Sequence, residues 1–166
     1  MVVAAAGCGA NEEKRSGAEG EFIEAGEALY QVQLTRLLNP RDRPDDQLLR
    51  GQTPATRDEQ YLAIFLKIEN KGSESYSPPR DMRIVDTEGN QYLPLDATQS
   101  GFGLDFGSQI PPGDQAPPPG SPAAEGPNAA AMLLFRVKTQ SATDNLPLVL
   151  EVPTGEKAVS RITLDV

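Results

Sequence analysis

The sequence of 166 residues contains no histidine and no tryptophan, and it has a single cysteine. Without histidine, the chain lacks the most common general base and the most common ligand of transition metals. One cysteine can form neither an intrachain disulfide nor a cysteine-rich zinc site. We therefore predict a protein that is not an enzyme and that has no catalytic residues, no metal site and no cofactor.

Basic residues are also scarce, with 15 Lys and Arg against 24 Asp and Glu and a net charge of −9. A surface that binds phosphate groups needs clustered Lys and Arg, so nucleic acid is not expected as a partner. Anionic lipid headgroups would repel the chain for the same reason. Apolar runs are shorter than the roughly 20 residues of a transmembrane helix, so contact with a membrane is expected only through an N-terminal lipid anchor.

The N-terminus, MVVAAAGCGA, places the small residues Ala6 and Gly7 directly before Cys8. This pattern resembles the lipobox of bacterial lipoproteins, in which the cysteine thiol carries a diacylglycerol. The apolar stretch before it is shorter than the roughly 7–15 residues of a signal peptide, which suggests that the true start lies upstream. We interpret residues 1–8 as a truncated lipoprotein signal with lipidation at Cys8. The alternative is an ordinary terminus with an inert cysteine.

The segment after Cys8 is polar, charged and rich in Gly and Ala, which is typical of a flexible tether. We therefore predict a tether over residues 9–26 and a single domain over residues 27–166. The expected location is extracytoplasmic, with the lipid on Cys8 holding the domain at the outer face of the plasma membrane.

Apolar residues alternate with polar ones in several short segments, and this period of two predicts β-strands. Residues 61–69 are apolar on both faces, as expected of a strand away from a sheet edge. A turn signal at residues 86–90 predicts a hairpin. The predicted strands are residues 28–38, 61–69, 82–87, 91–95, 130–139, 146–152 and 161–166. This pattern predicts an all-β fold, a two-sheet antiparallel β-sandwich of about seven strands.

Two long loops, residues 39–59 and 96–128, are rich in Pro and charged residues or in Pro and Gly. The first carries Asp42, Asp45 and Asp46, which could bind calcium or form ion pairs with nearby arginines. Their spacing lacks the alternating pattern of a helix-loop-helix calcium site, so ion pairs are favoured.

The second loop contains two aromatic residues flanked by glycine, Phe102 and Phe106, and the acidic Asp105. Loops carried on a rigid scaffold are frequent binding surfaces. The candidate interaction residues are therefore Asp42, Asp45, Asp46, Phe102 and Phe106, and Asp105 is a further candidate for a cation.

The segments YLAIFLKIEN, DTEGNQYLPL, MLLFRVKT and LPLVLEV, with a Pro-Gly loop between the second and third, form a recognisable series. The series resembles the immunoglobulin-like domain of uncharacterised bacterial surface lipoproteins of the actinobacterial type, a domain of unknown function. The matching positions are Asn70, Asp86, Gly89, Tyr92, Phe135 and Val137. The resemblance covers residues 28–166 and implies an immunoglobulin-like sandwich on the cell surface, without implying an activity.

These observations favour a non-catalytic, lipid-anchored extracytoplasmic module that binds an unknown protein or cell-envelope component. The alternative is an accessory domain of the envelope that binds carbohydrate or a cation. The absence of tryptophan weighs against a carbohydrate platform.

Overall fold

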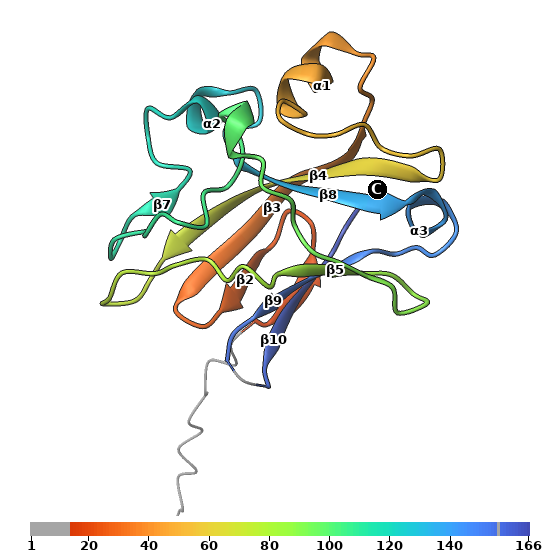
Figure 1. The fold of residues 1–166 in the computed structure, drawn as a ribbon. Coiled ribbons are helices and arrows are strands. Elements are labelled where there is room, and N and C mark those ends of the chain that lie inside the picture. The colour runs from red at the N-terminus through yellow and green to blue at the C-terminus, as the bar shows by residue number, and fades with distance from the viewer. Residues whose placement is uncertain (1–13, 156) are drawn as a thin grey trace, which may run out of the picture.

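The computed structural model describes residues 14–155 and 157–166, and Figure 1 shows them as two β-sheets packed face to face. The first sheet has the order β1 (Ser16–Ala18), β10 (Val159–Thr163), β9 (Val149–Pro153), β5 (Arg83–Val85) and β6 (Gln91–Tyr92). The second has the order β2 (Phe22–Ala25), β3 (Ala28–Leu38), β4 (Glu59–Asn70) and β7 (Gln115–Ala116), and β8 (Ala131–Lys138) also pairs with β4. The predicted all-β sandwich is confirmed. One pair, β1 with β10, is parallel, whereas antiparallel pairing was predicted throughout.

The few helices are short and lie in the connections. They are α1 (Arg43–Leu48), the 3-10 turn η1 (Thr98–Ser100), α2 (Pro122–Glu125) and α3 (Thr139–Thr143). Pro44 and Pro122 stand in the first turns of α1 and α2, where a missing backbone N–H costs nothing. No helix in the described residues is long and apolar enough to cross a membrane.

Strand β4 is the centre of the second sheet, as the apolar character of both its faces predicts. It pairs antiparallel with β3 along one edge and with β8 and β7 along the other. Ile64 and Leu66 point into the main core between the sheets, whereas Tyr61 and Phe65 point to the outer face. All four side chains are at most 2% exposed, so β4 is covered on both sides.

The outer face of the second sheet therefore carries a second apolar cluster, which we call the outer core. Its residues are Leu38, Leu48, Leu49, Tyr61, Ala63, Phe65, Ala97, Ala130, Met132 and Leu134. Leu48 and Leu49 come from the α1 loop, and Ala97 and Ala130 flank the Pro/Gly-rich loop. The two long loops thus close over the upper part of this sheet, where α1 and α2 lie in Figure 1.

Residues 16–18 and 22–25 correct the predicted tether, because they form β1 and β2 within the two sheets. Ile23 is fully buried, and β2 pairs antiparallel with β3. The prediction failed because strands this short are stabilised by their neighbours in the sheet, not by their own composition. Cys8 and the first residues of the predicted tether lie outside the described residues.

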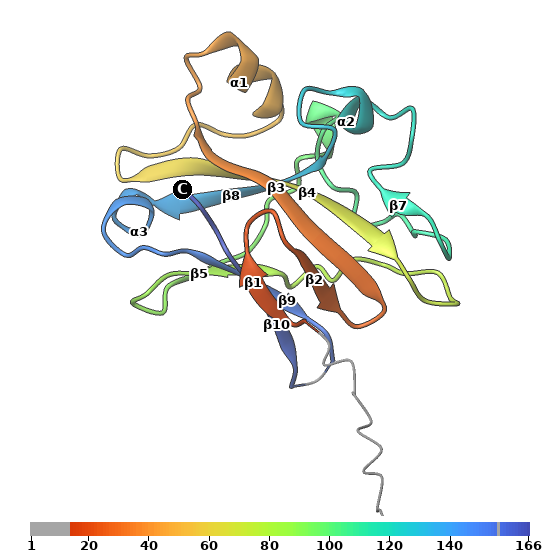
Figure 2. The same ribbon diagram turned by 180° about the vertical axis from the view of Figure 1, so that it is seen from behind.

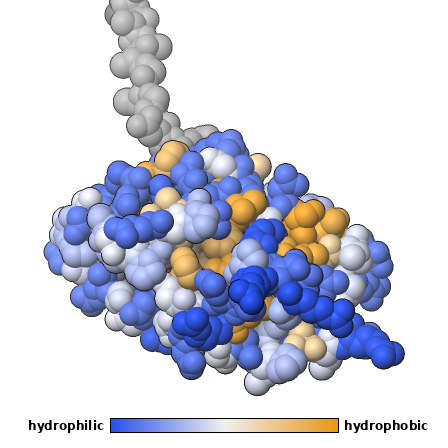
Figure 3. Space-filling view, turned by 90° about the horizontal axis from the view of Figure 1, so that it is seen from above, coloured by the Kyte–Doolittle hydropathy of each residue, from blue (hydrophilic) through white to orange (hydrophobic). Residues whose placement is uncertain are grey.

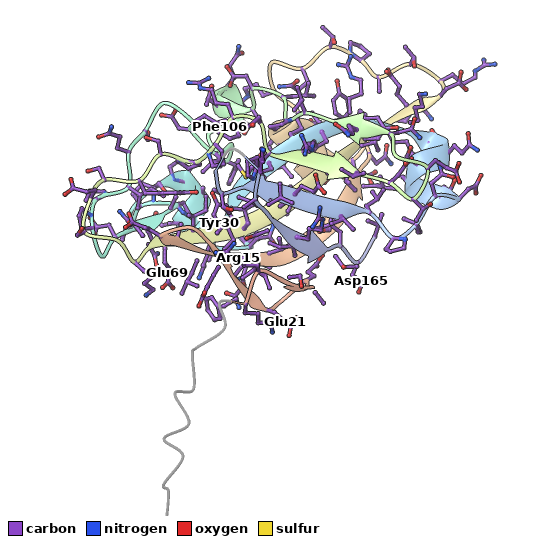
Figure 4. The ribbon with its side chains drawn as sticks, turned by 90° about the horizontal axis from the view of Figure 1, so that it is seen from below. Arg15, Glu21, Tyr30, Glu69, Phe106 and Asp165 are labelled. Carbon is purple, nitrogen blue, oxygen red and sulfur yellow. The ribbon has the colours of Figure 1, made fainter. Side chains whose placement is uncertain are left out.

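The turn between β1 and β2 joins the two sheets through Glu19. Its carboxylate accepts hydrogen bonds from the N–H of Thr35, 3.0 Å away on β3, and from the N–H of Asp165, 3.1 Å away after β10. The backbone N–H groups of Glu19 and Gly20 add bonds to Thr163 and Val32. Figure 4, seen from below, shows Arg15 and Glu21 near the start of the described chain and Asp165 further away from it.

Several strand boundaries also differ from their predictions: β6 ends at Tyr92, β10 spans Val159–Thr163, and β9 starts later than expected. Residues 146–152 were expected to form a strand, but β9 begins at Val149. Pro147 cannot donate a hydrogen bond to the ladder, and Leu146 is 39% exposed instead of facing the core. Leu148 and Leu150 are fully buried, as the alternation predicts.

Candidate binding surface

The three aspartates of the first long loop differ in burial and in hydrogen bonding. Asp45 is buried, and its carboxylate accepts bonds from Arg36 Nη2 at 2.6 Å and from the N–H of Asn39 at 2.8 Å. Burial raises the pKa of Asp45, but the bonds from Arg36 and Asn39 outweigh burial and lower it. Asp42 and Asp46 are exposed. The ion-pair prediction holds for Asp45, although its partner lies on β3 and not in the loop.

Acidic residues do not gather into a ligand set in the described part of the chain. Across residues 14–155 and 157–166, no three Asp, Glu, Cys or His side chains are close enough to hold a metal ion. The Asp45 pair instead fixes the start of α1 against β3.

Several sheet edges are protected against the addition of another strand. The outer edge of β2 is covered, because the N–H of Glu24 donates to the carbonyl of Lys14 at 2.8 Å. Along β8, the carbonyls of Met132 and Leu134 accept bonds from loop residues. Strand β7 has two residues and is followed by Pro117, which has no N–H. These hydrogen bonds and Pro117 hinder the addition of a strand from another molecule at these edges. The loops are therefore the better candidates for binding.

The Pro/Gly-rich loop encloses a cavity of about 430 Å³ beside β7, which we call the proline-lined cavity. Buried core residues form its floor, including Leu104, Ile110 and Ala116. Its walls contain Pro78, Pro111, Pro117, Pro118 and Pro119. The volume lies within the range of about 300–1,000 Å³ found for ligand pockets.

Two carboxylates, Asp105 and Asp114, are the charged residues that line this cavity, and both are exposed. Asp105 accepts bonds from Ser108 Oγ at 2.7 Å and from the N–H of Gly107 at 2.8 Å. These bonds, led by the one from Ser108, lower the pKa of Asp105. The mouth of the cavity is therefore negatively charged at neutral pH.

The cavity is held in place by hydrogen bonds to the end of β4. The buried side-chain amide of Asn70 donates to the carbonyl of Ile110 at 2.8 Å, and Ile110 also exchanges two backbone bonds with Tyr76. The Tyr76 hydroxyl bonds to that of Tyr30 at 2.8 Å within the core. Burial, together with the neighbouring Tyr76, raises the pKa of Tyr30 well above its usual value. The loop is thus fixed before any ligand arrives.

A second hollow of about 290 Å³ lies between α1 and α2, and we call it the α1–α2 groove. Phe65 and Leu48 of the outer core line it, together with the partly exposed Phe102. Figure 3, which views the molecule from above, shows apolar side chains in the middle of this face with hydrophilic ones around them.

The two predicted aromatic residues do not share a site. Phe102 lines the α1–α2 groove, whereas Phe106 packs against the main core and lines a different hollow with Arg80 and Asp96. Figure 4 shows Phe106 in the same view as the core residue Tyr30. Neither aromatic side chain lines the proline-lined cavity, although Asp105 beside Phe106 does.

A buried carboxylate that the sequence did not single out as a site is Asp86, which is 6% exposed. It accepts bonds from Ser141 Oγ at 2.6 Å, from Asn145 Nδ2 at 3.0 Å and from Asn90 Nδ2 at 2.8 Å. The N–H groups of Asn90 and Glu88 also donate to it. Burial raises its pKa, but the hydrogen bonds outweigh burial and hold the pKa well below the usual value. The hydrogen bond from Ser141 connects the β5–β6 turn to α3. Because Asp86 and Ser141 are both buried, a substrate cannot reach this cluster.

Comparison with known proteins identifies relatives by structure. No family model and no curated protein matches the sequence. An uncharacterised beta-sandwich protein of Clostridium difficile 630 is similar, with 16% identity, a TM-score of 0.54, and coverage of 94% of this chain and 97% of that one. The yjhA protein of Bacillus subtilis has 17% identity and a TM-score of 0.55, covering 89% of this chain and 99% of that one.

A third similar structure is the "putative lipoprotein (ycdA)" of Bacillus subtilis, with 14% identity and a TM-score of 0.50. The match covers 90% of this chain but 39% of that one. The chain shares the β-sandwich fold of these proteins. At these identities, the likeness shows the fold alone.

Proposed function

We propose that the protein is a non-catalytic, lipid-anchored extracytoplasmic domain that binds a protein or another component of the cell envelope. The observation that carries this proposal is the arrangement of the sandwich. The described chain begins at the end of the domain opposite α1 and α2, as Figures 1 and 2 show. An anchor at Cys8 would therefore present the two long loops away from the membrane.

Three further observations support the proposal. Ala6 and Gly7 precede Cys8 as small residues precede the lipidated cysteine of a lipobox. One protein of similar fold, from Bacillus subtilis, is described as a "putative lipoprotein". The preformed cavity and groove supply concave apolar surfaces of the kind that binding proteins use.

Lipidation of Cys8 is tested in the source cell by tagging the chromosomal gene at its 3′ end, so that any upstream signal is kept. We expect the tagged protein to incorporate an alkyne-labelled fatty acid and to sediment with membranes. Cys8→Ala should abolish the label and release the protein. Unlabelled protein with an intact Cys8 would remove the anchor from the proposal.

Binding through the loops is tested with a photo-cross-linking residue in living cells. Ser108 lies exposed at the proline-lined cavity, and Glu88 lies exposed at the tip of the β5–β6 turn. We expect p-benzoylphenylalanine at position 108 to give cross-linked products of defined mass that position 88 does not give. Equal products from both positions, or none from either, would contradict a binding role for this surface.

A further inference from the structure

We infer that the proline-lined cavity receives the side chain of a lysine or arginine from an extended segment of a partner polypeptide. This inference rests on the proposed function, because it names the chemistry of the partner that the same surface would bind.

The charge of the lining is the first argument. The cavity is lined by Asp105 and Asp114 and by no lysine or arginine. Neither carboxylate forms an ion pair with another residue in the described part of the chain. Arg80 lies near enough to Asp105 to lower the pKa of that carboxyl, but it is not part of the lining. A bound cation would therefore meet two carboxylates and one nearby arginine, which leaves the local charge negative. The net charge of −9 also attracts cationic partners over longer distances.

The hydrogen-bonding character of the lining points the same way. Proline has no N–H donor, and three successive prolines, Pro117 to Pro119, border the cavity. The carbonyl of Pro118 already accepts the N–H of Ser121, so the prolines act mainly by removing donors from the lining. The hydroxyl of Ser108 is already donated to Asp105. The side-chain amides of Gln109 and Gln115 and the hydroxyl of Ser121 remain as donors. A lining dominated by acceptors suits lysine and arginine, whose side chains carry donors only.

The apolar floor is the third argument, because it suits a side chain with a long apolar stem. Lysine and arginine bury their methylene stems along apolar surface and keep the charged end in a polar region. Here the stem would lie on Leu104, Ile110 and Ala116, and the charged end would reach the carboxylates at the mouth. The volume of about 430 Å³ also leaves room for residues that flank the basic one.

The test uses the complete 166-residue chain, labelled with ¹⁵N, and two acetylated and amidated peptides, Gly-Pro-Lys-Pro-Gly and its norleucine counterpart. We expect the lysine peptide to shift the amide signals of Gly103, Ser108 and Ala116. The norleucine peptide keeps the stem and lacks the charge. It should bind about fivefold more weakly or worse, since each charge pair at an exposed site contributes modestly.

The matched variants separate local charge from net charge. Asp105→Asn combined with Asp114→Asn should lower the affinity for the lysine peptide to that for the norleucine peptide. Asp42→Asn combined with Asp46→Asn removes the same net charge from exposed positions outside the cavity and should leave the affinity unchanged within twofold. Raising the salt concentration should weaken the lysine peptide selectively.

Three outcomes would overturn the inference. The first is equal binding of the two peptides, and the second is a set of shifts confined to the α1–α2 groove. The third is binding of hexylammonium as tight as that of the lysine peptide, which would assign the cavity to a small amine. If cross-links form from position 108 while the inference fails, the proposed binding role stands and only the chemistry of its partner is wrong.

Discussion

A chain that begins at Glu27 is expected to be at least about 4 kcal/mol less stable than one that begins at Lys14, which is a large part of the roughly 5–15 kcal/mol that stabilises a typical domain. The deletion removes β1 and β2, and with them the fully buried Ile23 and the carboxylate of Glu19 that bonds to both sheets. It also exposes the edge of β3 along its pairing with β2. Urea unfolding followed by circular dichroism measures the difference.

A substitution within the same segment supplies the control. Phe22 is 50% exposed on β2, so Phe22→Ser in the chain that begins at Lys14 should change the free energy of unfolding by no more than about 1 kcal/mol. If the two chain lengths unfold at the same urea concentration, β1 and β2 do not contribute to the fold as the structure indicates.

Replacing Asp86 should give the largest loss among single polar substitutions. Asp86→Ala leaves the side-chain amide of Asn145 and the backbone N–H of Asn90 without their acceptor, whereas Ser141 keeps its bond to the Tyr92 hydroxyl. Each unsatisfied group costs about 1–3 kcal/mol. We expect a loss of about 3–5 kcal/mol at pH 7, measured by urea unfolding. Glu88→Ala removes an exposed side chain from the same turn and should cost less than about 0.5 kcal/mol.

The effect of Asp86 should also depend on pH. Its pKa is lower in the folded state than the roughly 3.9 of an unfolded aspartate, so its stabilising effect is present above that value. It is lost progressively as the pH falls below about 4, because the folded protein must then retain an ionised group that the unfolded chain has protonated. The difference between the wild type and Asp86→Ala should accordingly shrink between pH 7 and pH 2. A constant difference would show that the charge of Asp86 does not contribute.

Much of the sandwich was predictable because its long strands repeat an apolar residue at every second position. Strands β3 and β4 and the turn at Asp86 to Gly89 follow directly from local patterns. Strands β1 and β7 carry no such pattern, since they are two or three residues long and depend on partners far away in the sequence. The outer core was hidden for a related reason. Phe65 and Leu48 look like independent apolar residues until the α1 loop folds over β4.

The candidate surface was harder to predict than the fold. Asp45 finds its partner Arg36 on a different element, and Asp86 is reached by Ser141 of α3 and by Asn145, which follows α3. Such contacts depend on tertiary packing, which residue spacing does not encode. The loop at residues 96–128, which the sequence offered as a candidate interaction loop, lines a cavity. Its cavity, however, is built from prolines and core aliphatic residues and not from the two phenylalanines.

The outer core limits how this surface can change. The α1 loop and the flanks of the Pro/Gly-rich loop supply apolar side chains that cover β4, so neither segment can be exchanged whole without uncovering that strand. The chemistry of this surface is therefore easier to alter at single exposed rim positions such as Ser108 than by exchanging a whole loop.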